Sequence, residues 1–322
     1  MYNNRISTAA RYNLLTADIK KNEANFNRLT QQLASGKKVT SISDDPIAAV
    51  NIVNTNRQLG QIETFNSNVS MGMKELDTLD DLMELAGSYL NTAWDKATQA
   101  NNGTYGVPSL KALKTEIDEI TKTMVDLANT EFNDNFMFAG ANTKLTPYEM
   151  TDDGKIVYTG TKHDNPDYVR QTEVADGVFE VINTTGDVVF GWYNDENDYS
   201  GVMGALKILS NSIQEVIDAK ESGDQTAETA GYDKMRSTLD MFKDSLTEIT
   251  TEQTKFGGVY NRLQMTESTL ETNNENLTAY LSQIQDVDLA KAASDWYQAQ
   301  YAYQASLQIA AQSMNMSLLN YM

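Results

Sequence analysis

Few side chains in this sequence are suited to covalent or metal chemistry. The 322 residues include no cysteine and one histidine, His163. Thiolate nucleophiles, cysteine-ligated zinc or iron–sulfur centres and metal sites built from several histidines are therefore excluded. His163 is followed by Asp164 and Asn165-Pro166, which is typical of a turn, so we assign it no catalytic role.

Carboxylates are the remaining candidates for acid–base or metal chemistry. Asp80-Asp81 and Asp118-Glu119 fall in amphipathic helical stretches, where adjacent acids usually face solvent. The cluster Asp195–Asp198 lacks the spacing of a calcium-binding loop. We therefore expect no catalytic residue, no metal and no cofactor, and we predict that the protein is not an enzyme.

The N-terminal segment contains a cluster of basic residues without the glycine-rich loop that binds phosphate. We therefore expect these side chains to pair with acidic residues of adjacent subunits. They are Lys20, Lys21, Arg28, Lys37 and Lys38.

Charge is distributed unevenly along the chain. The formal net charge is −20, which argues against nucleic acid as a partner. Residues 1–38 nevertheless carry seven basic and two acidic side chains, and residues 289–322 carry one of each. The middle of the chain therefore holds all of the acidic excess. Crowding of many copies at the two ends would explain why no acidic excess is found there.

No apolar run approaches the roughly 18 residues that a membrane span requires. The first residues, Met1 to Ser7, lack the apolar core of a secretory signal peptide. We expect a protein that stays in the cytoplasm or leaves it by a route that reads no cleaved signal, without insertion into a membrane.

The first half of the chain is patterned as long helices. Residues 5–33 show apolar residues at alternating steps of three and four, and Ser35-Gly36 predicts the stop. After a short linker, Asp45 fits an N-cap and Pro46 the first position of a second helix. This helix is predicted to run to about Ala100, roughly 80 Å at about 1.5 Å per residue.

The rest of the chain surrounds a β-rich interval with further helices. A turn near residues 101–108 leads to a third helix, and residues 141–199 contain short β-type runs at 156–158, 168–172, 178–182 and 188–190. Helix resumes near Gly201, and a long element then carries apolar residues every seven positions from Met235 to Ile284.

The last segment is apolar on two faces and nearly uncharged. One stripe runs through Leu289, Ala293, Trp296, Gln300, Tyr303, Leu307, Ala310 and Met314. We predict that it pairs with the Tyr12–Leu33 stripe and that the second face serves self-association. Residues near 1–35 and 290–322 are then expected to be mobile in the isolated monomer and to order on assembly.

These elements predict a mainly α fold with a small β module. The expected architecture is an elongated rod of long antiparallel helices with heptad packing and both termini at one end. Three domains are expected. Residues 1–42 and 285–322 form a terminal coiled-coil core, residues 43–140 and 200–284 form a helical rod, and residues 141–199 form an outer β domain.

Several motifs resemble the flagellin superfamily, and within it the family of hook–filament junction proteins. The most specific is Leu33–Lys38 followed by Ser43-Asp44-Asp45-Pro46 and Ile47–Ala49, which resembles the family's linker between terminal helix and rod. Asn135–Thr143, Gln285–Ala290 and the ending Ser317–Met322 resemble further parts of the family.

The resemblance implies a structural axial protein of the bacterial flagellum, exported through the flagellar type III apparatus to the outside of the cell. Its terminal helices would fold and pack into the assembly, joining the hook to the filament. Implied partners are the first hook-associated protein, flagellin, further copies in a ring and a cytoplasmic export chaperone.

We predict an assembly interface from the two terminal stripes, with hydrophobic burial as the drive. Its residues are Tyr12, Ile19, Phe26, Leu29, Leu33, Trp296, Tyr303, Leu307, Met314 and Leu318. The linker motif adds Ser43, Asp44, Asp45 and Pro46.

Two alternatives stay open at the level of sequence. Within the superfamily the chain could be a flagellin, the filament subunit itself. From a different class, it could be a type III-secreted adhesin or carbohydrate-binding protein with the β region as its working surface.

Overall fold

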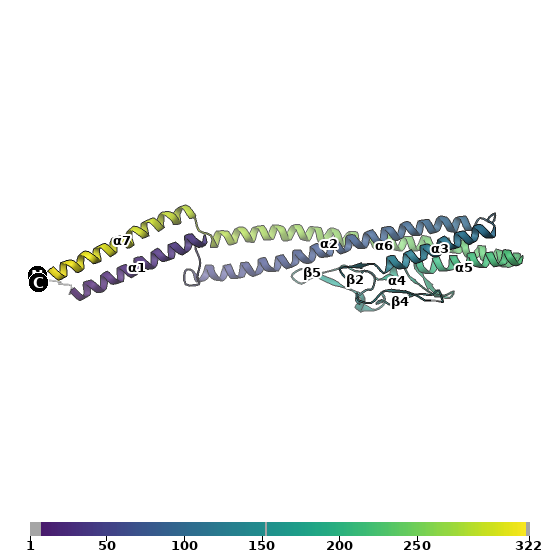
Figure 1. Ribbon diagram of the computed structural model, residues 1–322, viewed down its shortest axis with the longest axis horizontal. Helices are drawn as coiled ribbons and strands as arrows, with labels where there is room; N and C mark the ends of the chain where they lie inside the picture. Colours follow the sequence, from purple (N-terminus) through teal and green to yellow (C-terminus); the bar gives the residue numbers. More distant parts are fainter. Residues whose placement is uncertain (1–7, 152, 320–322) are drawn as a thin grey trace. The chain divides into compact units, whose positions relative to one another are not determined.

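Long helices make up most of the chain, with a small amount of β structure between them (Figure 1). The computed structural model describes residues 8–151 and 153–319, with side chains in the outermost helices described only from residue 10 and up to residue 313. The long helices are α1 (Thr8–Ser35), α2 (Pro46–Ala100), α3 (Val107–Ala128), α5 (Gly201–Ser222), α6 (Gln225–Gln285) and α7 (Leu289–Leu319). The predicted fold class, mainly α with a small β module, is confirmed.

The helix ends lie where the sequence signals them. Gly36 adopts a left-handed φ of +69° directly after α1, and Gly223 does the same, at +78°, after α5. Such a backbone suits glycine because no Cβ opposes it. Asp45 caps α2: its Oδ1 accepts hydrogen bonds from the backbone N–H of Ile47 at 3.0 Å and of Ala48 at 2.9 Å.

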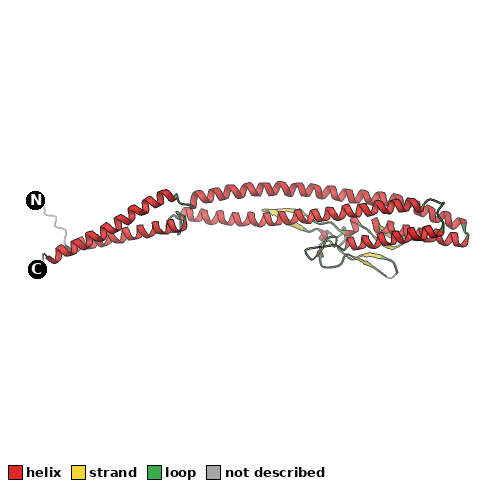
Figure 2. Cartoon of the chain, turned by 45° about the horizontal axis from the view of Figure 1, so that its top comes forward, coloured by secondary structure: helices red, strands yellow, loops and turns green. Residues whose placement is uncertain are grey.

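The β structure forms three small antiparallel sheets, drawn in yellow in Figure 2. One hairpin joins β1 (Glu131–Phe132) to β2 (Asn135–Phe136), and another joins β5 (Gln171–Ala175) to β6 (Val178–Val181). The third sheet has the order β3-β4-β7-β8, with β3 Tyr148–Met150, β4 Ile156–Tyr158, β7 Trp192–Asp195 and β8 Asp198–Ser200. The predicted strands at 156–158 and 178–182 correspond to β4 and β6. The strand predicted at 168–172 coincides with β5 only from Gln171, because Pro166–Tyr168 forms a short 3-10 helix, η1.

The strand predicted at residues 188–190 is wrong. Val188 and Val189 end a single helical turn, α4 (Gly186–Val189), and Phe190 is its C-cap, with its N–H donating to Gly186 O at 2.8 Å. Val189 and Phe190 are fully buried. A short apolar run of this kind indicates burial but does not separate strand from helix. A side chain at Gly186 would collide with the Tyr148 and Tyr158 rings, which explains the glycine there.

The described residues fall into two compact units. The terminal unit comprises residues 8–63 and 271–319, and the central unit comprises Thr64–Leu270. In the terminal unit α1 and α7 lie side by side (Figures 1 and 2). They are antiparallel, because Lys37, after α1, pairs with Asp286, before α7.

Heptad packing holds the helices of the central unit. In α6 the sevenfold series Met235, Phe242, Ile249, Phe256, Leu263 and Leu270 is buried, as its spacing predicts. A second buried series with the same spacing consists of Thr238, Ser245, Glu252 and Val259. The residues that directly follow this second series, Leu239, Leu246, Gln253 and Tyr260, are half-buried. In α2 Leu76, Leu79 and Met83 are buried, and Asp80 is exposed, as expected for an acidic residue on an amphipathic helix.

The hairpin β5–β6 is anchored to α2 and α6 within the central unit. Arg262 of α6 donates two parallel hydrogen bonds to Glu180 of β6, at 2.9 and 2.7 Å. Arg170 forms an ion pair with Glu75 of α2, and burial lowers the pKa of the Arg170 guanidinium.

Candidate assembly interface

An aromatic cluster joins α1 to α7. The ring of Phe26 lies 5.5 Å from that of Trp296 and 6.1 Å from that of Tyr303, centroid to centroid. Trp296 Nε1–H donates to Thr30 Oγ1 at 2.8 Å, which satisfies the indole donor. Leu29 is buried one turn further along α1. The predicted pairing of the two terminal stripes is therefore present.

The α7 stripe that faces α1 differs in part from the predicted one. Among the residues of α7 up to 313, whose side chains are described, the most buried are small: Ala292, Ala299 and Ser306. Leu289 and Leu307, which the predicted stripe contains, are exposed. The bulky rings of Trp296 and Tyr303 fill the interface, and the turns between them admit only small side chains. The sevenfold spacing of these small residues in the sequence indicates the buried side of α7. The predicted stripe was chosen from large apolar residues and therefore did not include them.

The structure places the remaining predicted residues as follows. Tyr12, Ile19 and Leu33 are half-buried on the side of α1 that also carries Phe26. Met314 and Leu318 lie outside the residues whose side chains are described. Sequence reasoning missed Gln32, which is buried and whose Nε2 donates to Lys38 O at 2.7 Å.

The motifs Leu33–Lys38 and Gln285–Ala290, far apart in the sequence, contact each other at the end of this helix pair. Lys38 N–H donates to Gln285 O at 2.7 Å, and Val287 N–H donates to Gly36 O at 2.9 Å. The segment after α1 is thereby bonded through its backbone to the segment before α7. Backbone bonding of this kind depends little on side-chain identity.

The linker before α2 is held by Asp44. Its Oδ2 accepts hydrogen bonds from Thr40 N–H at 3.0 Å, Thr40 Oγ1 at 2.9 Å and Ser41 N–H at 2.8 Å. These bonds, the one from the Thr40 backbone first, lower the pKa of the Asp44 carboxyl. Ser43 and Pro46 are exposed.

The side of α7 that faces away from α1 remains uncovered in the monomer. Tyr297 and Tyr301 are exposed on this side, and the only charged residues of the 31-residue helix are Lys291 and Asp295. A helix surface that is both uncharged and apolar is typical of a protein interface.

The polar residues singled out in the sequence have local roles. The ring of His163 lies 4.7 Å from that of Tyr168. Asp195 Oδ1 accepts the backbone N–H of Asn197 at 2.8 Å, inside the turn between β7 and β8. Asp118 binds Ser210 and Lys114. Within residues 8–151 and 153–319, no group of three or more acidic or histidine side chains is arranged to hold a metal ion.

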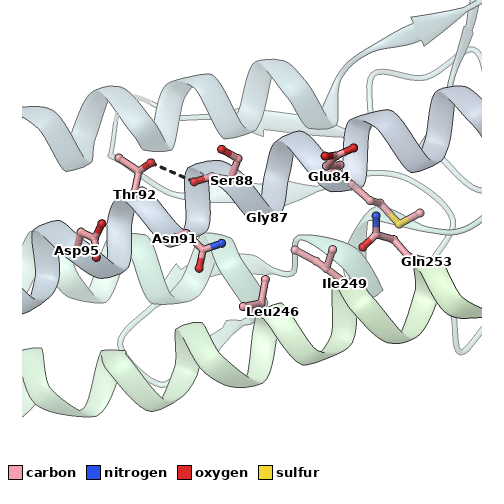
Figure 3. Close-up of a pocket in the computed structure, with 10 residues that line it drawn as sticks. Glu84, Gly87, Ser88, Asn91, Thr92, Asp95, Leu246, Ile249 and Gln253 are labelled. Carbon is pink, nitrogen blue, oxygen red and sulfur yellow. Dashed lines mark hydrogen bonds between the residues drawn. The ribbon is translucent and has the colours of Figure 1, made fainter.

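A shallow groove of about 460 Å³ runs between α2 and α6 in the central unit (Figure 3). Gly87, Leu246 and Ile249 line it together with polar residues of α2. Its two carboxylates, Glu84 and Asp95, lie about three helical turns apart on α2, roughly 16 Å at about 1.5 Å per residue. That separation is too large for paired acid–base catalysis, so the groove offers no catalytic geometry.

None of the helices among the described residues has the length and apolarity that crossing a bilayer would demand.

Comparison with known proteins gives two family matches, one at each end of the chain. The model of the bacterial flagellin N-terminal helical region matches residues 6–143, and that of the C-terminal helical region matches residues 239–322. The chain belongs to the flagellin family. The matched regions contain α1, α2, α3, α7 and most of α6, and therefore both halves of the α1–α7 interface. Most of the β structure and α5 lie in the part of this flagellin-family chain that neither model matches.

Full-length relatives within the family carry two kinds of name. The flagellar hook-associated protein 3 of Salmonella typhimurium is 25% identical over 98% of this chain and 98% of its own. A flagellin of Bacillus subtilis is also 25% identical, over 97% of this chain and 95% of its own.

Solved structures agree on the fold. A putative flagellar hook-associated protein from Vibrio parahaemolyticus aligns with a TM-score of 0.61 at 21% identity, covering 76% of this chain and 100% of that one. The flagellar hook-associated protein 3 of Legionella pneumophila aligns with a TM-score of 0.62 at 14% identity, covering 72% and 98%.

Proposed function

We propose that this chain is a hook–filament junction protein, a non-enzymatic structural subunit of the bacterial flagellum. The observation that carries the proposal is the α1–α7 pair, whose aromatic core is formed within one chain while its outer face is left apolar and uncharged. Full-length similarity to proteins named flagellar hook-associated protein 3 supports the same function.

The mechanism is coupled folding and packing of the terminal helices. The α1–α7 pair has low stability in the monomer, and assembly orders it by burying its outer face, at roughly 25 cal/mol per Å² of apolar area. The absence of excess charge on α7 keeps like charges from accumulating where copies crowd together. In this proposal residues 1–42 and 285–322 form the core layer, residues 43–140 and 200–284 the rod layer, and residues 141–199 the outer domain.

The proposed partners follow from the proposed position of this protein between the hook and the filament. The first hook-associated protein lies on one side, flagellin on the other, and further copies of this chain complete a ring. Export through the type III apparatus, with a cytoplasmic chaperone bound beforehand, delivers the chain to the extracellular flagellum. A chain without cysteine is compatible with that route.

Electron microscopy of purified components tests the function. Hook ends capped with the first hook-associated protein are mixed with this protein and then with the cognate flagellin. We expect filaments to grow only when the protein is added before flagellin. Growth of equal yield without it would contradict the junction role.

Flagellin itself is the second candidate, because the flagellin of Bacillus subtilis matches over almost the whole chain at the same identity. The two functions differ in what the purified protein does alone. A flagellin polymerises by itself into long filaments, whereas a junction protein stops after a limited layer on a hook end.

The variant Phe26→Asp tests the proposed mechanism. A carboxylate between the rings of Trp296 and Tyr303 would lack a polar partner, so we expect α1 to separate from α7 and incorporation at hook ends to be abolished. Near-ultraviolet circular dichroism should still report a folded central unit. Phe26→Leu keeps an apolar side chain and is the matched control, expected to retain most incorporation. Incorporation of the aspartate variant at the normal level would contradict the role of the α1–α7 aromatic core in assembly.

A further inference from the structure

The first turns of α2 carry an apolar patch that the interface described above does not use. Ile47, Val50 and Val53 are 76, 59 and 67% exposed, and Ile42 in the preceding linker is 74% exposed. The opposite side of the same turns is buried, at Ile52 and Thr55. We call Ile42, Ile47, Val50 and Val53 the α2 patch.

Helix propensity does not account for the α2 patch. Isoleucine and valine are poorer helix formers than alanine or leucine, because their branched Cβ restricts rotamers against the preceding turn. Exposed helix positions normally carry polar residues. Three β-branched residues on one exposed face are therefore explained by packing against something that the isolated chain does not contain. Residues 46–56 also lack any charged side chain, so the partner needs no charge of its own.

A second surface in the terminal unit has the matching chemistry. Tyr297 and Tyr301 of α7 are 55 and 68% exposed, one turn apart on the face directly opposite Ala299. Tyrosine is enriched at protein interfaces because its ring buries area while its hydroxyl keeps a polar partner. Asn54, exposed on the same face of α2 as Val50, offers such a partner.

We propose that the α2 patch of one copy is covered by Tyr297 and Tyr301 of a second copy. Both surfaces are exposed in the same molecule, so they do not cover each other within one chain. The second copy fits because it supplies an uncharged aromatic face of the required kind. This inference rests on the proposed self-association, and it names the surfaces that meet.

A contact between two different surfaces has a consequence for assembly. Because each copy offers both surfaces, the contact is heterologous: it leads to a closed ring if the rotation between copies closes and to a helical array if it does not. Either outcome suits a layer between hook and filament.

Cysteine cross-linking tests the contact without background, because the chain has no cysteine of its own. Val50→Cys and Tyr301→Cys are made in separate full-length chains of different tag size and mixed at high concentration with a short bis-maleimide. We expect a cross-linked heterodimer. Asn56→Cys, exposed about 120° from Val50 around α2, is the matched control and should give at least tenfold less product with Tyr301→Cys.

Substitution provides the second measurement. Val53→Asp adds a charge at an exposed position, so circular dichroism and melting of the monomer should stay unchanged while self-association weakens at least tenfold by light scattering. Asn56→Asp adds the same charge outside the patch and should leave self-association unchanged.

Equal cross-linking at positions 50 and 56, or no cross-linked heterodimer at all, would overturn the proposal. If the cross-linking fails but filaments still grow from hook ends with the unsubstituted protein, the contact is wrong and the junction function is still supported. If filaments do not grow from hook ends with the unsubstituted protein, the junction function is contradicted.

Discussion

At the scale of single residues, the linker before α2 shows how one carboxylate orders a short segment. Asp44 accepts three hydrogen bonds from Thr40 and Ser41, while Asp45 caps the helix that follows. Neighbouring aspartates thus have different tasks. The sequence indicates the cap, because Asp-Pro before a helical pattern is a start signal, but the bonds of Asp44 depend on the bend of the linker.

The lowered pKa of Asp44 predicts a pH dependence of the linker. Since the folded value lies below the ordinary value of 3.8, the bonds stabilise the linker above that pH and are lost as the pH falls through the lowered value. We expect the NMR amide shifts of Thr40 and Ser41 to change together with a midpoint below 3.8. Asp44→Asn should remove this step. A midpoint at or above the ordinary value would contradict the role of these bonds.

At the scale of elements, α6 is a heptad helix whose glycines face different surroundings. A Cβ at Gly231 would lie 2.6 Å from Cγ2 of Val216, so α5 and α6 approach closely there. At Gly257 a Cβ would meet nothing within 4 Å. The sequence shows both as glycines inside a helix, and only the packing distinguishes them.

These two glycines predict opposite effects of the same substitution. Gly231→Ala should destabilise the central unit by about 1–3 kcal/mol, because the new methyl forces α5 away from α6. Gly257→Ala should stabilise it by up to about 1 kcal/mol through helix propensity. Denaturant unfolding followed by circular dichroism measures both. Equal effects of the two substitutions would mean that the close approach at Gly231 is not energetically important.

At the scale of the whole molecule, the two compact units differ in how fully their side chains are buried. In the central unit many large side chains are completely buried, among them Phe138, Phe190 and Phe242. In α1 only Leu29 and Gln32 are buried among the residues with described side chains, and several others are half-buried. Less buried apolar area per residue implies lower local stability for the α1–α7 pair in the monomer.

This difference predicts the order of proteolysis. We expect dilute trypsin to cut the monomer first after Lys20, Lys21, Arg28 and Lys291, with Lys114 and Lys207 of the central unit protected. Mass spectrometry of the fragments over time measures the order. In assembled junctions the same α1 sites should be protected, because neighbouring copies cover them. A monomer whose α1 and α7 survive as long as the central unit would argue against ordering on assembly.

Much of the fold is determined by the sequence alone. Sevenfold spacing in α6, the Asp45-Pro46 start and the glycines after α1 and α5 predict long helices and their ends, because these signals act over a few neighbouring residues. The motifs around the linker likewise suffice to indicate the flagellin family.

Only the tertiary structure decides which residues meet. It places Ala299 rather than Leu307 against α1, because the rings of Trp296 and Tyr303 occupy the available space. It makes a helical turn of residues 186–189, and it leaves Val50 and Tyr301 exposed together. Local patterns report apolarity and period, whereas the choice of partner depends on volumes contributed by segments far apart in the chain.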